Sequence, residues 1–248
     1  MPQSFLFVRS QDRILGTSSS FKVTLPNSYK NITAVSLVSA ELPYSTYNLD
    51  SIYTSGVTVT YNSTALSLVL TPGFYTIADL VAWLLATLQS SLSAAGVTAV
   101  SYSTISGKIT ISYSGSSAFS IQSNNTGSLG RIVGCDPLGL VTYGTSGVLV
   151  LPCLATLAPV NTIFMRISEL PSLMCSTNGQ HATFRLQMSA AHGSIVMHNA
   201  ASSVANTNVY TSAPSTLSSL TVALFSQDGQ PINLNSVDWS FTLLISSA

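Results

Sequence analysis

Short runs in which apolar and polar residues alternate dominate this chain of 248 residues. Phe21, Val23 and Leu25 alternate with polar neighbours, and the same period of two recurs from Trp239 to Ile245. Because successive side chains of a strand point to opposite faces, this period predicts half-buried β-strands. Gly, Pro, Asn and Ser interrupt such runs at intervals of about 8 to 12 residues, which is the spacing of a β-sandwich or barrel.

The pattern predicts strands along most of the chain and few other elements. The segments with strand character are Ser4 to Val8, Phe21 to Leu25, Ala34 to Glu41, Val57 to Tyr61, Ala65 to Leu70, Lys108 to Tyr113, Phe119 to Gln122, Val148 to Leu151, Ile163 to Ile167, Ala182 to Met188, Leu220 to Ser226 and Asp238 to Ile245. Ser106-Gly107-Lys108 and Gln227-Asp228-Gly229-Gln230 have the composition of turns. Ser189 to Ser219, rich in Ala, Ser, Thr and Asn, is expected to form long loops.

One segment has helical instead of strand periodicity. Thr76 and Asp79 form an N-terminal capping signature, and apolar residues follow at spacings of three and four from Ile77 to Leu92. Gly96 is a suitable helix end. We predict one amphipathic helix over about residues 76–95, whose apolar stripe packs on the β-core and does not face a membrane or cofactor.

Charged residues are scarce: eight are basic and eight acidic, or 6% of the chain, where a soluble domain usually has about a quarter. Such a surface does little to keep free copies apart. We therefore expect part of it to be covered with hydroxyl groups or buried against other subunits, as in a component of an assembly.

Neither a membrane protein nor a nucleic-acid-binding protein fits the composition. Mean hydropathy is +0.43, but the best apolar stretches, Leu80 to Leu88 and Val148 to Val160, are shorter than the roughly 18 residues of a spanning helix. The first residues lack the features of a signal peptide, so a cytosol-like compartment is expected. Net charge is zero, so a basic nucleic-acid groove has no global support.

The length allows one large all-β domain or two small domains, and no linker composition argues for two. We expect one domain over residues 1–248 with a short N-terminal arm over about residues 1–15. Arg9, Arg13, Lys22 and Lys30, against Asp12, make the N-terminal part basic. A solvated arm explains these charges more simply than an acidic partner does.

Candidate catalytic or metal-binding residues are few. Three cysteines, Cys135, Cys153 and Cys175, are spaced for neither a disulfide framework nor a zinc ribbon, so free and mostly buried thiols are expected. His192 and His198 can share a metal only if their loop folds back. Nucleophile-elbow, phosphate-loop and zinc-protease motifs are missing from the sequence, and we expect no catalytic residue, cofactor or metal.

Several blocks of this chain resemble the penton-type minor capsid proteins of double-stranded DNA viruses of the giant-virus, virophage and polinton kind. They cover about half of the chain in the same order. The blocks are Phe7 to Arg13, Phe21 to Pro26, Lys30 to Asn48, Pro72 to Tyr75 with the helix that follows, Gly107 to Ile111, and Leu217 to Ile245.

The resemblance implies an all-β fold, a single jelly-roll sandwich, and a structural role without enzymatic activity. It further implies a homopentameric ring at the fivefold vertices of an icosahedral capsid, made inside the host cell and located in the virion. The expected partners are other copies of the chain, the viral major capsid protein, and other minor capsid or spike proteins. Arg9, Asp12 and Arg13, in the first block, are our candidates for the assembly interface.

Three alternatives remain at this point. The first is a receptor- or glycan-binding spike or adhesin head that uses exposed tyrosines for stacking. Its candidate residues are Tyr44, Tyr47, Tyr53, Tyr61, Tyr143 and Tyr210. The second is a major capsid protein, although these have two jelly rolls and longer chains. The third is an enzyme, which would need a pocket with convergent His or acidic groups.

Overall fold

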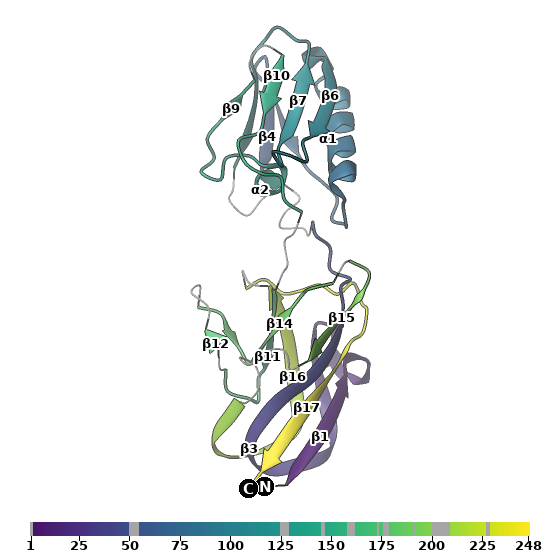
Figure 1. Cartoon of the computed structure of the whole chain (residues 1–248), viewed down its shortest axis with the longest axis vertical. Coiled ribbons are helices and arrows are strands. Elements are labelled where there is room, and N and C mark those ends of the chain that lie inside the picture. Colours follow the sequence, from purple (N-terminus) through teal and green to yellow (C-terminus); the bar gives the residue numbers. More distant parts are fainter. Residues whose placement is uncertain are drawn as a thin grey trace. The chain divides into compact units, whose positions relative to one another are not determined.

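The chain divides into two compact units in a computed structural model (Figure 1). Unit 1 comprises Met1–Thr46 and Val160–Ala248, and unit 2 comprises Tyr47–Pro159. The structure describes residues 2–49, 55–124, 129–144, 147–157, 162–172, 174–175, 179–190, 192–199, 209–226 and 229–248, and of residues 209–215 the backbone alone.

Unit 1 is built from antiparallel strands contributed by both ends of the chain. Its elements are β1 (Gln3–Arg9), the 3-10 helix η1 (Ser10–Asp12), β2 (Leu15–Gly16), β3 (Ser20–Pro43), β11 (Thr162–Ile167), β12 (Met174–Cys175), β13 (His181–Ala182), β14 (Phe184–Gln187), β15 (Ile195–Asn199), β16 (Val209–Ser226) and β17 (Ser240–Ser247). The main sheet has the order β1-β17-β3-β16-β11-β14, with β2 and β15 also paired to β3. β12 and β13 form a separate hairpin.

The long strand β3 makes this sheet curl into a sandwich. Its first residues pair with the end of β16, whereas its last residues pair with β15 and with the start of β17. The alternation of buried and exposed side chains is interrupted between Pro26 and Asn31, where Asn31 has a φ of 55°. The two halves of β3 therefore belong to different parts of the curled sheet, and the apolar core lies between them.

Period-two packing in unit 1 follows the sequence pattern. Phe21, Val23 and Leu25 are buried and their polar neighbours are exposed. On β17, Phe241, Leu243 and Ile245 are buried and alternate with half-buried residues, and Trp239, just before this strand, is buried as well. Each fully buried large apolar side chain contributes about 1.5–3 kcal/mol relative to an exposed one, so this alternation fixes which face of each strand is turned inward.

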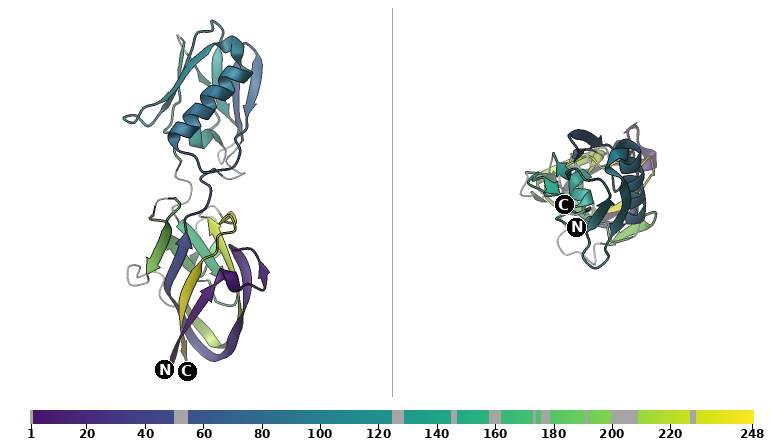
Figure 2. Two further views of the ribbon diagram at one scale, coloured as in Figure 1. Left: turned by 90° about the vertical axis from the view of Figure 1, so that its right-hand side faces the viewer. Right: turned by 90° about the horizontal axis from the view of Figure 1, so that it is seen from above.

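Unit 2 is a second small β-structure with its own apolar core. Its elements are β4 (Val57–Tyr61), β5 (Thr64–Leu68), α1 (Ile77–Ser91), the 3-10 helix η3 (Ser93–Ala95), β6 (Val97–Tyr102), β7 (Ile109–Tyr113), β8 (Phe119–Ser123), α2 (Leu129–Val133), β9 (Thr142–Tyr143) and β10 (Val148–Val150). They form one sheet of order β5-β4-β8-β9 and another of order β10-β7-β6. Helix α1 runs alongside β6 (Figure 2).

Helix α1 confirms the predicted amphipathic helix. The Thr76 hydroxyl accepts a hydrogen bond from the Asp79 amide at 3.2 Å, and the Asp79 carboxylate accepts one from the Thr76 amide at 2.9 Å. Leu80, Leu84 and Leu88 are fully buried in the core of unit 2. Gly96, with a φ of 58°, ends the following 3-10 turn, as a residue without a Cβ does at little cost.

The prediction of an all-β jelly-roll sandwich with one amphipathic helix is confirmed, while several details differ. The single domain expected over residues 1–248 is divided into two units. The expected N-terminal arm over residues 1–15 is instead mostly strand, because β1 pairs with β17 and buries Leu6 and Val8. The loop expected from Ser189 to Ser219 contains β15 and the first half of β16.

The predicted turn at Ser106-Gly107-Lys108 lies between β6 and β7. Gly107 has a φ of 65° between β6 and β7, and its amide donates to the Ser103 carbonyl at 2.7 Å. In the other turn Gln227 and Asp228 lie outside the described residues. The flanking Ser226 amide donates to the Gln230 carbonyl at 2.8 Å.

Candidate assembly surface

Arg9 and Asp12, two of the three predicted interface residues, bind each other at the end of β1. Arg9 Nε and Nη2 donate to the two Asp12 carboxylate oxygens at 2.9 and 2.7 Å. Both side chains are about half exposed, and the carboxylate raises the pKa of Arg9 above its ordinary value. The helix η1 places the two residues three positions apart on one tight turn, which closes this pair.

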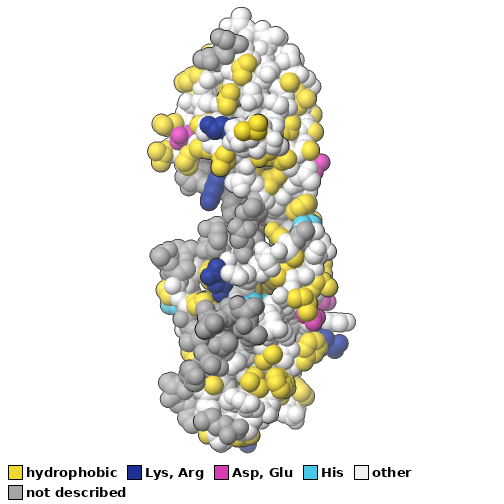
Figure 3. Space-filling view, in the orientation of Figure 1, with side chains coloured by type: hydrophobic (Ala, Val, Ile, Leu, Met, Phe, Trp, Pro, Cys, Tyr) yellow, Lys and Arg dark blue, Asp and Glu magenta, His cyan; other side chains and the backbone are white. Residues whose placement is uncertain are grey.

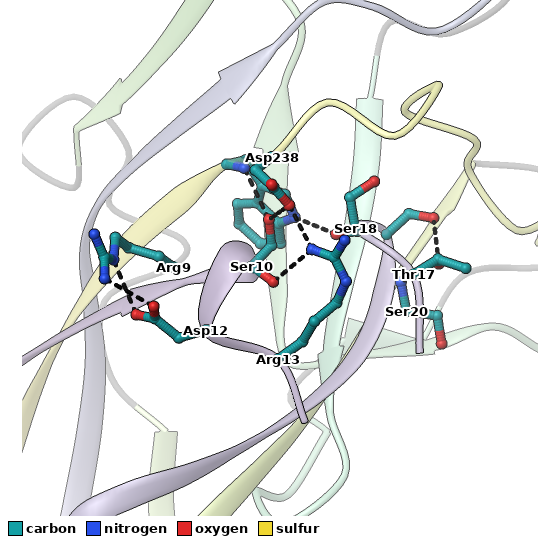
Figure 4. A network of polar contacts seen from close by, with 10 residues as sticks. Arg9, Ser10, Asp12, Arg13, Thr17, Ser18, Ser20 and Asp238 are labelled. Atoms are coloured by element: carbon teal, nitrogen blue, oxygen red, sulfur yellow. Dashed lines mark hydrogen bonds and ion pairs between the residues drawn. The ribbon is translucent and has the colours of Figure 1, made fainter. Parts of the chain in front are cut away.

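Arg13, the third predicted interface residue, is held by Asp238 at the other end of the sequence (Figure 4). Arg13 Nη1 donates to Asp238 Oδ1 at 2.6 Å and to the Ser10 carbonyl at 2.9 Å. The buried Ser10 hydroxyl donates to the same Asp238 oxygen at 2.8 Å. The Ser10 hydroxyl and then Arg13 hold the pKa of Asp238 below its ordinary range.

Ser10 and Trp239 connect this cluster to the core of unit 1. The Trp239 amide donates to the Ser10 hydroxyl at 2.9 Å, and the Ser10 amide donates to the Trp239 carbonyl at 2.8 Å. The buried Trp239 ring donates through Nε1 to the Ser18 carbonyl at 2.7 Å and packs against Phe21 and Phe241. We call Ser10, Arg13, Asp238 and Trp239 the N-terminal clamp. Its hydrogen bonds join the turn after β1 to the start of β17.

Next to the clamp lies the outer face of β1, β17, β3 and β15. The strand register aligns Arg9, Ser240, Glu41 and Met197 across the four strands, so their side chains share one side. The flanking strands present large apolar side chains to solvent. They are Phe5 and Phe7 (60% exposed) on β1, and Ile195 and Met197 (68% exposed) on β15. Hydrophobic side chains gather over β1 and β17 in Figure 3.

A groove of about 450 Å³ runs along this face. Its walls include Phe7 and Ile195, and its polar lining includes Arg9, Glu41 and Asp238. The Ser240 hydroxyl donates to Glu41 at 3.3 Å. We call this groove and its exposed apolar margins the apolar face of unit 1. Apolar side chains gathered around a few polar groups are typical of surfaces that other proteins cover.

The two histidines considered as metal ligands have separate surroundings. The His192 ring packs edge-on against Tyr44, with ring centroids 5.8 Å apart. His198 lies on β15 opposite Ala40, and its partial burial lowers its pKa. Within the described part of the chain, no cluster of three or more His, Cys, Asp or Glu residues is placed to hold a metal ion.

The cysteines differ in exposure. Cys135 is buried, Cys153 is half-buried and Cys175 is exposed, so the expectation of mostly buried thiols is wrong for Cys175. Burial raises the pKa of Cys135 to about 12, with smaller contributions from Cys153 and Asp136. The Cys135 thiol therefore stays protonated and unreactive at neutral pH.

Two of the four tyrosines that the structure describes among the stacking candidates have exposed rings. Tyr61 is buried in unit 2 and Tyr44 is half-buried in unit 1, whereas Tyr47 and Tyr143 are exposed. Tyr53 lies outside the described residues, as does the side chain of Tyr210.

None of the described helices is long and apolar enough to span a bilayer.

The sequence matches no family model and no curated protein. Among solved structures, the crystal structure of the mavirus penton protein is similar to this chain, with a TM-score of 0.54 and 11% sequence identity. The likeness covers 100% of this chain and 100% of that chain. It therefore shows that the overall fold, including both units, is shared.

Proposed function

We propose that this chain is a structural capsid protein, a penton subunit that forms a ring of five at the vertices of an icosahedral virion. The observation that carries the proposal is the fold shared with a penton protein over the full length of both chains. In this role the partners are neighbouring copies and the surrounding viral major capsid proteins. The function is structural and not catalytic, and its place is the virion.

Surface chemistry supports this proposal independently of the fold. A cyclic ring uses two different patches of each subunit, so a large share of every subunit is covered. Interfaces are depleted in Lys and Glu, and only 16 of 248 residues are charged. In a ring the scarcity of charge is a consequence of assembly.

The apolar face of unit 1 is the surface that we assign to assembly. Phe5, Phe7, Ile195 and Met197 lie in one sheet and point to solvent, and burying each against a partner removes a large apolar side chain from water. The exposed Arg9–Asp12 pair adjoins this face, where we assign it to the polar rim. Arg13 supports the rim indirectly, by holding the turn through Asp238.

The mass of the native protein across a concentration series tests the proposal. A discrete species of five times the 26.0 kDa chain mass is expected. Phe7→Asp should weaken assembly at least about tenfold, because a charge would be buried at the interface. Circular dichroism of this variant checks that it remains folded.

The matched control is Ile105→Asp, which changes an equally apolar and fully exposed residue of unit 2 and should assemble normally. A protein that stays monomeric at high concentration and does not join major capsid protein would contradict the proposed function. A ring that Phe7→Asp leaves intact would contradict only the assignment of this face.

A further inference from the structure

The outer face of the β5-β4-β8-β9 sheet in unit 2 differs from the apolar face of unit 1. The register places Thr60, Ser120 and Tyr143 side by side across three strands, and Thr58 opposite Gln122 in the next outward row. These side chains are partly or largely exposed, while their neighbours along β4 and β8 are buried. The outward rows carry hydroxyl and amide groups without a charge.

A groove of about 460 Å³ lies on this face, a volume within the range of small-ligand sites. Thr58, Thr60, Asn62, Ser120, Gln122 and Tyr143 contribute its polar lining. Every residue that lines it, within the described part of the chain, is uncharged. We call it the hydroxyl groove.

Two of its polar groups are held in place by hydrogen bonds. Gln122 Nε2 donates to the Gly139 carbonyl at 2.8 Å, which fixes the orientation of the side-chain amide. Asn124 Nδ2 donates to Thr58 Oγ1 at 3.0 Å, so the Thr58 hydroxyl keeps its proton for another acceptor. Groups that are already oriented lose little conformational entropy when a ligand binds.

Tyr143 gives the hydroxyl groove an aromatic wall. It is 66% exposed on the edge strand β9 and lies opposite Ser120. The amide of the next residue, Gly144, donates to the Phe119 carbonyl at 2.8 Å and fixes the end of this strand. An exposed ring beside hydroxyl and amide groups offers an apolar surface and polar partners to the same ligand.

The chemistry of the lining selects the class of ligand. A phosphate or another anion would find no counter-charge here, and a nucleic acid is bound mainly through such charges. A protein partner usually needs an apolar interface core, whereas Ala118 and Val141 are the apolar aliphatic residues that line the groove. A neutral sugar matches it, because its hydroxyls pair with the lining and its C–H face packs on the tyrosine ring.

We propose that the hydroxyl groove of unit 2 binds a neutral glycan, with Tyr143 as the stacking platform and Gln122 and Thr58 as hydrogen-bonding partners. This site is independent of ring formation, since it lies on unit 2 and uses none of the residues assigned to assembly. A capsid subunit with such a site would contact carbohydrate in addition to its capsid neighbours.

Saturation-transfer NMR and calorimetry on the full chain test the proposal. The probes are lactose, mannotriose and chitotriose, with sialyllactose and a heparin tetrasaccharide as charged counterparts. At least one neutral sugar should bind with roughly millimolar affinity, as a shallow site allows. Tyr143→Ala should weaken that binding about 3- to 10-fold, and Gln122→Ala should also weaken it.

Two further variants separate stacking from other effects. Tyr143→Phe keeps the ring and should bind like the original protein, and Tyr47→Ala changes another exposed tyrosine of unit 2 and should have no effect. Any of three results would overturn the proposal. The three neutral probes all fail to bind, the protein prefers the charged probes, or Tyr143→Ala leaves sugar binding unchanged. Glycan binding by a protein that forms no ring would contradict the penton role alone.

Discussion

Unit 1 and unit 2 are both small β-structures, but they expose different chemistry. Unit 1 presents aromatic and aliphatic side chains on the outer face of β1, β17, β3 and β15. Unit 2 presents hydroxyls and amides on the outer face of β4, β8 and β9. Each unit also has its own buried core. A chain with few charges can therefore have two different kinds of face, one with apolar side chains that suit protein partners and one with hydroxyls and amides that suit water or neutral ligands.

The charged residues follow the same division. Unit 2 contains only five of the 16 charged residues, namely Asp50, Asp79, Lys108, Arg131 and Asp136. Unit 1 uses several of its own in specific pairs, as in Arg9–Asp12 and Arg13–Asp238. In unit 1 these pairs fix the turn beside the apolar face, whereas the hydroxyl groove of unit 2 is lined by uncharged residues within the described part of the chain.

The largest effect is expected from substitutions in the core of one unit, which should destabilise that unit and leave the other unchanged. Leu84→Ala removes a fully buried side chain from the core of unit 2 and should destabilise that unit by about 2–5 kcal/mol. Leu243→Ala should do the same to unit 1. Because the cores are separate, scanning calorimetry should show each variant lowering a different transition. A single transition that both variants shift equally would mean that the units unfold as one.

A smaller effect is expected from the N-terminal clamp. Ser10→Ala removes the donor to Asp238 and the acceptor of the Trp239 amide, and it leaves a buried N–H without its partner. Unit 1 should lose about 1–3 kcal/mol of unfolding free energy in urea. Ser106→Ala, at an exposed turn of unit 2, is the control and should change little. Equal stability of the two variants would show that the clamp contributes nothing.

Strong local signals made much of the fold predictable. The capping residues Thr76 and Asp79 identified the start of α1, and the alternation from Trp239 to Ile245 identified β17. Strand β6 was missed because its register shifts between Val97 and Ala99, which breaks the period of two. Strand β15 was missed because Ile195 and Met197, its outward residues, are apolar too.

The division into units and the apolar face were not predictable from local patterns. Both units have the same strand spacing, and the sequence has no Gly- or Ser-rich run where it passes from Thr46 to Tyr47 or from Pro159 to Val160. Arg9, Asp12 and Arg13 could be named from the sequence because they form a polar cluster in the first block of the resemblance. The groove beside them joins residues from separate parts of the chain, such as Phe7, Glu41 and Ile195, which only the strand pairing brings together.

Histidine titration offers a milder test, because all three histidines belong to unit 1. Burial lowers the pKa of His198 in the folded protein, so the unfolded chain takes up a proton first as the pH falls below about 6.5. Unit 1 should therefore lose stability as the pH falls from 7 through this range towards the lower folded pKa of His198. Unit 2, without a histidine, should not change. Calorimetry at several pH values measures both transitions, and His198→Gln should reduce the slope for unit 1. If unit 2 loses as much stability as unit 1, or if His198→Gln leaves the slope unchanged, the partly buried imidazole of His198 does not cause the pH dependence of unit 1.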